Sequence, residues 1–147
     1  MAVGRDLSAS EFFGGVRKGL KAELPAELRR FEVGRGHSRL LKIHYGRPEL
    51  HFEAWHHTGG GRMEVGLHFE GPAALNDRVL AFFRSRIVEV KAGLPRAELE
   101  PWDRGWSRLY ETLGAPVLDS GAQAETLRRL SAYITTLQPM LTDFLEE

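Results

Sequence analysis

The chain contains no cysteine and no long apolar run. Without cysteine, disulfide bonds, thiolate nucleophiles and zinc sites built from cysteine are excluded. No stretch approaches the roughly 18 to 20 consecutive apolar residues of a membrane-spanning helix. Residues 1–10 also lack the apolar core of a secretion signal. We therefore expect a cytoplasmic protein without a membrane span.

Amide side chains are scarce as well, because Asn76, Gln123 and Gln138 are the only ones. Few thermolabile amides are typical of thermophilic proteins. Arginine far outnumbers lysine, a bias that codon composition explains equally well, since the general thermophile signal is enrichment in lysine and glutamate. These features indicate a source and not a function.

Net charge is also absent, since 20 basic residues balance 20 acidic ones. The charge is uneven along the chain: residues 1–48 hold ten Lys or Arg and five Asp or Glu, whereas residues 49–147 hold ten and fifteen. Oppositely charged parts favour packing against each other or head-to-tail association. A nucleic-acid-binding domain is usually net basic, so a nucleic-acid partner is disfavoured.

The composition that remains is that of an ordinary globular domain. The chain has 147 residues, of which 42% are hydrophobic and 27% charged. A chain of this length buries enough surface to fold without disulfides or metal. We expect a single α+β domain over residues 1–147.

The opening segment predicts a helix. Its apolar residues recur at steps of three and four, and Ser8 or Ser10 can cap its start. Pro25 ends this helix or begins a short second turn through Leu28. The apolar positions are Phe12, Phe13, Val16 and Leu20.

From residue 39 to residue 70 the apolar period changes to two, which predicts three half-buried strands. The turns between them, residues 46–49 and 58–61, are short and rich in glycine, so the strands should form consecutive antiparallel hairpins. Residues 31–35 add an expected edge strand. The alternating apolar positions are Leu41, Ile43 and Tyr45, then Leu50, Phe52 and Ala54, then Met63, Val65, Leu67 and Phe69.

The second half of the chain predicts further helices and strands. Residues 72–90 carry a broad apolar stripe that should lie across the apolar face of the sheet. Residues 99–102 and 106–112 are expected strands. A last helix starts near Ala122, is expected to kink at Pro139, and should pack on the first helix. The fold class is thus α+β: an antiparallel meander of three to five strands, one helix on its apolar face, and packed terminal helices.

Strand register groups three histidines on the polar face of the predicted sheet. Pairing Phe52 with Leu67 places His51 opposite His68, and the preceding hairpin places His44 opposite His51. Glu53 and Glu70 flank this row, and Glu53 is expected to join His44, His51 and His68 as a further metal ligand or as a base. Neighbouring strands lie about 4.8 Å apart, so imidazoles of this row can share a zinc or another transition-metal ion if the outer two lean inward. The alternative is a polar face that merely tolerates histidine.

The glycine-rich turn before Arg62 suggests a second, weaker site. Backbone amides of Gly59, Gly60 and Gly61 can cradle an anion, as glycine nests do. The turn lacks the strand-to-helix setting of a phosphate loop, and a hairpin explains its glycines fully.

Aromatic and basic residues alternate between residues 102 and 110. In an extended conformation, one face would interleave aromatic rings with guanidinium groups and could stack nucleic-acid bases or hold an acidic ligand. The alternative is that these aromatics anchor the core or an interface. The residues are Trp102, Arg104, Trp106, Arg108 and Tyr110.

The last helix also raises the question of a dimer. Its apolar stripe near residue 140 is large and must be covered. Packing on the first helix of the same chain covers part of it, and a homodimer through this C-terminal helix is the alternative.

Three segments together resemble an uncharacterised bacterial family. The hairpin at residues 50–69, the helix at residues 75–90 and the aromatic strand at residues 102–110 carry the likeness, with the phrase Glu64-Val65-Gly66-Leu67-His68-Phe69-Glu70. Members of this family are small sheet-and-helix domains of unknown function, some of which accompany restriction-endonuclease-like modules. The resemblance implies a compact accessory unit; it implies no catalytic residues and no nuclease chemistry.

Three functions follow as hypotheses. No arrangement of nucleophile, base and acid stands out, so we expect a non-enzymatic binding or assembly module of a bacterial cytoplasmic protein. A metal-binding protein or metal-dependent enzyme using the histidine row is the first alternative. Single-stranded nucleic-acid binding through the Trp/Arg/Tyr ladder is the second.

Overall fold

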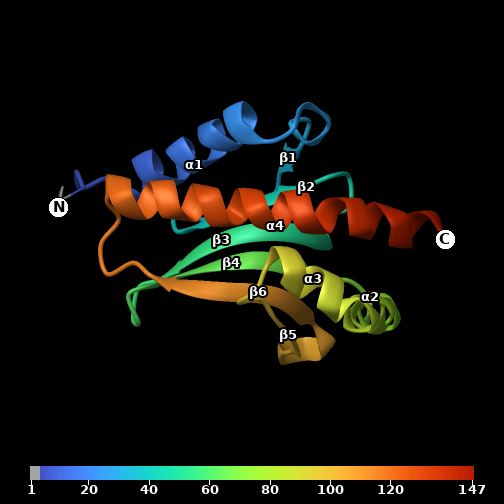
Figure 1. Ribbon diagram of the computed structural model, residues 1–147. Coiled ribbons are helices and arrows are strands. Elements are labelled where there is room, and N and C mark those ends of the chain that lie inside the picture. Colours follow the sequence, from blue (N-terminus) through green and yellow to red (C-terminus); the bar gives the residue numbers. More distant parts are fainter. Residues whose placement is uncertain (1–3) are drawn as a thin grey trace.

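The computed structural model describes residues 4–147 and shows an α+β fold, in which helices cover one face of an antiparallel sheet (Figure 1). The helices are α1 (Ala9–Glu23), α2 (Ala73–Ser85), α3 (Ile87–Gly93) and α4 (Ser120–Glu146), with short 3-10 turns at Ala26–Leu28 and Asp103–Gly105. The strands are β1 (Glu32–Val33), β2 (Leu40–His44), β3 (Leu50–His57), β4 (Arg62–Phe69), β5 (Glu98–Pro101) and β6 (Ser107–Gly114). Within this part of the chain no helix is both long and apolar enough to cross a membrane.

Strand order in the sheet is β1-β2-β3-β4-β6-β5. The first four strands form the predicted meander, and the sheet has one strand more than the upper limit of the prediction. After β4 the chain passes through α2 and α3 to the far edge, forms β5, and returns as β6 between β5 and β4. All neighbouring strands are antiparallel.

The predicted register of the hairpins is confirmed. Phe52 pairs with Leu67 and His51 with His68, while Lys42 pairs with Glu53 in the preceding hairpin. The apolar set of each strand therefore shares one face, and its side chains are almost fully buried.

Helix α1 begins as its sequence predicts. Ser8 accepts a hydrogen bond from the backbone N–H of Glu11, and the Glu11 carboxylate accepts one from the backbone N–H of Ser8. This capping box satisfies two amides that have no partner within the helix.

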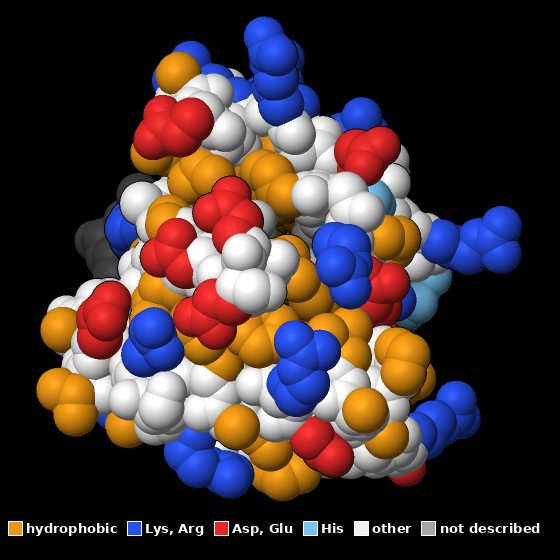
Figure 2. All heavy atoms as spheres, turned by 90° about the vertical axis from the view of Figure 1, so that its right-hand side faces the viewer, with side chains coloured by type: hydrophobic (Ala, Val, Ile, Leu, Met, Phe, Trp, Pro, Cys, Tyr) orange, Lys and Arg blue, Asp and Glu red, His pale blue; other side chains and the backbone are white. Residues whose placement is uncertain are grey.

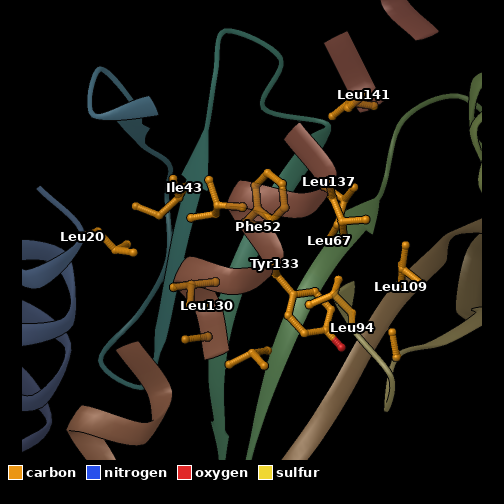
Figure 3. Close-up of a cluster of buried hydrophobic side chains, with 14 of the residues drawn as sticks. Leu20, Ile43, Phe52, Leu67, Leu94, Leu109, Leu130, Tyr133, Leu137 and Leu141 are labelled. Carbon is orange, nitrogen blue, oxygen red and sulfur yellow. The ribbon is translucent and has the colours of Figure 1, made fainter. Parts of the chain in front are cut away.

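Helix α4 is the main cover of the sheet, where residues 72–90 were expected. It lies across β3 and β4 and alongside α1, so the predicted packing of the terminal helices is confirmed (Figure 1). Tyr133 and Leu137 point from α4 toward Phe52 and Leu67 of the sheet (Figure 3). The helix runs without interruption through Pro139.

Residues 72–90 form two helices instead of one. Arg86 has φ −114° and ψ 20°, which is outside the helical range, and it separates α2 from α3. Helix α2 contacts β4, β5 and β6, and the Phe83 ring stacks on Phe69 at 5.8 Å. The apolar stripe packs on the sheet as predicted. It contacts β4, β5 and β6 at one side of the sheet, however, and does not lie across the whole apolar face.

The apolar stripe of α4 is already covered by the chain itself. Leu137, Met140, Leu141 and Phe144 are each no more than 8% exposed. On the end of the molecule that Figure 2 shows, hydrophobic patches are separated by acidic and basic side chains. Leu145 of this stripe stays partly exposed, so little of the unburied surface that suggested a homodimer remains.

Candidate metal centre

The polar face of the sheet is the one that α4 does not cover, and it carries the predicted histidines. Four of its ionisable side chains are nonetheless buried: His51, Glu53, Glu64 and His68 are 0–3% exposed. Neighbouring side chains on the same face exclude water. The Trp102 ring, for example, lies nearly perpendicular to the His68 ring, with 5.8 Å between the ring centroids. A group of ionisable residues is thus enclosed on a sheet face that has no helix over it.

His51 and His68 lie opposite each other on β3 and β4. Their rings are parallel within 11° with centroids 5.7 Å apart. Hydrophobic residues of the opposite face fix this register, so the two imidazoles face each other because Phe52 pairs with Leu67.

Two glutamates complete the group. The Oε1 atom of Glu53 is 2.9 Å from Nε2 of His51, and its Oε2 atom is 3.6 Å from Nε2 of His68. The Oε2 atom of Glu70 is 3.1 Å from Nδ1 of His68 and 4.0 Å from Nε2 of His51. His51, Glu53, His68 and Glu70, here called the His/Glu cluster, each offer one ligand atom within 4.8 Å of the others.

Each imidazole also has an outer partner. Nδ1 of His51 donates to the carbonyl oxygen of Pro48 at 2.9 Å, since that oxygen can only accept. Nε2 of His68 donates to Oε2 of Glu64 at 2.6 Å. Arg108 holds this carboxylate through Oε1 at 2.8 Å. Such outer hydrogen bonds fix the ring orientation of histidines that bind metals.

Charge in the cluster alters the pKa of its members. Burial by itself lowers the pKa of His68, but hydrogen bonds with Glu64 and Glu70 outweigh burial and raise it to about 9. Burial raises the pKa of Glu70 and Glu64, yet the hydrogen bonds and charge of His68 hold both below the usual value. The carboxylates of Glu64 and Glu70 are therefore anionic at neutral pH.

The structure brings together three of the four predicted metal ligands. His51, Glu53 and His68 meet, whereas His44 is not among the grouped ligand atoms. Nδ1 of His44 instead accepts from the backbone N–H of Gly46, 3.2 Å away, and lies 3.7 Å from Glu32. His44 sits near the β2–β3 turn, and Glu70, expected only to flank the row, takes the fourth position.

Glu64 is the partner that sequence reasoning missed. It lies four residues before His68 on β4, and side chains four apart in a strand share a face. The same parity that grouped the histidines places Glu64 beside them.

The ladder of aromatic and basic residues required an extended conformation from residue 102 to residue 110, and this stretch is not one extended strand. Residues 103–105 form a 3-10 turn between β5 and β6, with Arg104 at φ +62°. The hairpin still stacks part of the set: the Arg108 guanidinium lies 4.6 Å from the Trp102 ring centroid and 3.9 Å from that of Tyr110. Trp106 lies beside Trp102 at 6.3 Å.

The guanidinium of Arg108 is not free to bind an external anion. Glu64 and Glu100 both accept from it, at 2.8 and 2.7 Å. Two carboxylates thus neutralise the central cation of the stack.

Comparison with protein-family models, with curated proteins and with solved structures gives no match. The resemblance to a bacterial accessory family stays a prediction. Function must be inferred from the side chains themselves.

Proposed function

We propose that this protein binds a divalent transition-metal ion in the His/Glu cluster. One observation carries the proposal: both imidazoles have one nitrogen held by an outer acceptor, Pro48 or Glu64, and the other directed at carboxylates of the cluster. Histidines that bind metals are oriented in this way.

The charges of the cluster also favour a cation. Within residues 4–147, no Lys or Arg nitrogen lies within 4.0 Å of the carboxylate of Glu53 or Glu70; their ionic contacts are with His51 and His68 alone. The two hydrogen bonds among these contacts, His51 to Glu53 at 2.9 Å and His68 to Glu70 at 3.1 Å, each need a proton between nitrogen and oxygen. A divalent ion would replace these protons and compensate the buried carboxylate of Glu53 and the half-buried one of Glu70 at once.

Distances in the cluster suit a small ion. Two ligands bound at 2.0–2.1 Å in a tetrahedron lie roughly 3.3 Å apart. The inward nitrogens, Nε2 of His51 and Nδ1 of His68, lie 2.9 Å from Glu53 and 3.1 Å from Glu70, respectively, and Nε2 of His51 lies 4.0 Å from Glu70. Two nitrogen and two oxygen donors suit Zn²⁺ first, with Mn²⁺ and Fe²⁺ as weaker competitors in the usual affinity order.

Burial favours a binding role over catalysis. Catalytic zinc keeps an open position for water or substrate, whereas structural zinc is closed by protein ligands. Three of the four ligands are 0–3% exposed, and only the Glu70 side chain, at 15%, reaches the surface. The four cavities of 360–430 Å³ are lined by other residues. We therefore favour a non-enzymatic module whose bound metal stabilises the sheet.

Elemental analysis and calorimetric titration with Zn²⁺ test this function. We expect about one ion per chain, bound by the wild type and by the control E100Q, and lost in E70Q. Glu70 is a ligand near the surface, so its variant should fold, which circular dichroism checks. Glu100 contacts Arg108 and no cluster residue. Substoichiometric metal both as isolated and after zinc addition would remove the proposal.

The other expectations receive less support. Neutralised Arg108 argues against nucleic acid, and the largely covered stripe of α4 removes most of the reason given for a homodimer. The bacterial source and the cytoplasmic location stay predictions.

A further inference from the structure

We infer that a second site, independent of the proposed metal centre, binds the phosphate group of a small molecule or free phosphate at the β3–β4 hairpin. A cavity of about 390 Å³ lies there, between the turn at residues 58–60 and the segment that precedes β2. The side chains that define its chemistry are those of His37, Arg39, Trp55, His56, His57 and Arg62.

This cavity differs from the others in charge. Two arginines and three histidines line it, and no Asp or Glu does. Each of the other three cavities described within residues 4–147 includes at least one carboxylate: Asp6 in one, Glu98 in the other two. A concave surface with charge of one sign concentrates ions of the opposite sign.

Arg39 is fixed in place without being neutralised. Its Nη1 atom donates to Nδ1 of His56 at 2.8 Å, and Nε2 of His56 donates to the carbonyl oxygen of Ala115 at 2.8 Å. His56 is 6% exposed, and its Nδ1 atom accepts from Arg39 without contributing a negative charge. His56 therefore orients the guanidinium and does not neutralise it. Within residues 4–147 no carboxylate lies within 4.0 Å of Arg39 or Arg62.

The wall of the cavity is partly aromatic. The Trp55 and His57 rings lie 3.9 Å apart, and His57 also contacts Oε1 of Glu64 at 3.3 Å, on the side of the metal centre. The glycines of the turn leave room beside Arg62, whose side chain lies over Gly60. Arginine suits phosphate because its fork of N–H donors matches the oxygens.

Binding can be measured by calorimetry and by the change in tryptophan fluorescence, to which Trp55 contributes together with Trp102 and Trp106, with inorganic phosphate and phenyl phosphate as probes. The titrations contain EDTA, which keeps the proposed metal centre empty. The result therefore does not depend on whether the metal-binding proposal is right. We expect saturable binding that weakens at least tenfold in R39Q and in R62Q. Arg62 is exposed, so R62Q keeps the test valid if R39Q does not fold. The matched control is R35Q, because Arg35 is exposed and does not line the cavity.

The two probes separate the sources of the anion. Tighter binding of phenyl phosphate indicates a phosphate group carried by an aromatic molecule that uses Trp55, and equal affinities indicate free phosphate. The inference is overturned if neither probe saturates at millimolar concentration, or if R35Q weakens binding as much as R39Q does.

Discussion

At the scale of single residues, the His/Glu cluster holds two carboxylates, and within residues 4–147 no Lys or Arg nitrogen lies within 4.0 Å of either one, although the charge of Lys42 helps to lower the pKa of Glu70. Glu53 and Glu70 meet only imidazoles, so the charge of these rings decides whether the site is stable. Metal and protons compete for the same nitrogens.

The stability of the metal-free protein should therefore fall at mildly alkaline pH. His68 has a pKa of about 9 in the folded chain against an ordinary 6.5. Its contribution is fully present below pH 6.5 and is lost as the pH rises through 9, on the order of 1–3 kcal/mol. Urea unfolding in EDTA at several pH values measures this loss.

The variant H68Q is the control for this pH dependence. It removes the imidazole that contacts Glu53, Glu64 and Glu70, so its free energy of unfolding should vary much less between pH 6.5 and 9. An equal loss of stability in H68Q would assign the effect to other groups.

At the scale of elements, α1 and α4 approach each other closely through glycine. Gly15 faces the amide of Gln123, which donates to the carbonyl oxygens of Glu11 and Phe12 at 3.1 and 2.9 Å. A side chain at position 15 would displace that amide, whereas Gly14 has open space around it.

Two alanine variants of α1 should therefore change stability in opposite directions. Alanine favours a helix over glycine by roughly 0.5–1 kcal/mol, so G14A should raise the free energy of unfolding by that amount. G15A should lower it by about 1 kcal/mol or more, because the hydrogen bonds of Gln123 are lost. Denaturant unfolding compares them, and equal effects would contradict the predicted contact between α1 and α4.

Sequence periodicity predicted the elements that depend on local pattern. Alternation at residues 41–69 fixed three strands and their register, because a slip of one residue would expose Phe52 and Leu67. The break at Arg86 was not predictable, since its apolar stripe continues through α3 to Val90. The stacking of Arg108 on Trp102 was not predictable either, because it depends on the turn at residues 103–105. Arg104 in that turn has a left-handed backbone conformation, which the residue type does not predict.

Strand parity also accounts for what was right and wrong in the site. Parity assigned His51, Glu53 and His68 to one face, which the fold confirms. Parity and register did not predict the contacts of each side chain: His44 lies against Gly46 and Glu32, and Glu70, just after β4, takes the fourth position.

At the scale of the whole molecule, two phenols join the layers, that of Tyr45 half-buried and that of Tyr133 buried. The Tyr45 hydroxyl donates to the carbonyl oxygen of Leu28 at 2.7 Å, and Tyr133 of α4 donates to Glu111 of β6 at 3.0 Å. Burial raises the pKa of Tyr45 to about 12, and burial together with the charge of Glu111 raises that of Tyr133 further.

Alkaline unfolding should follow from these two phenols. Above pH 10 the unfolded chain ionises its tyrosines while the folded chain does not, so stability falls from pH 10 toward pH 12. Y45F should reduce this fall by about 1 kcal/mol, after a discount for its partial exposure. Circular dichroism during a pH titration measures it, and an unchanged slope in Y45F would refute the role of Tyr45.

The insertion of β6 between β4 and β5 has a consequence for folding during synthesis. The β2–β3–β4 meander can pair as soon as it leaves the ribosome, but β5 gains its only neighbour when β6 has been made. Helix α1 contacts β2 and α2 contacts β4, but much of the apolar face of β3 and β4 stays open to water until residues 120–146 emerge and α4 covers it. A nascent chain paused before α4 is therefore the form of this protein most exposed to aggregation and to chaperones.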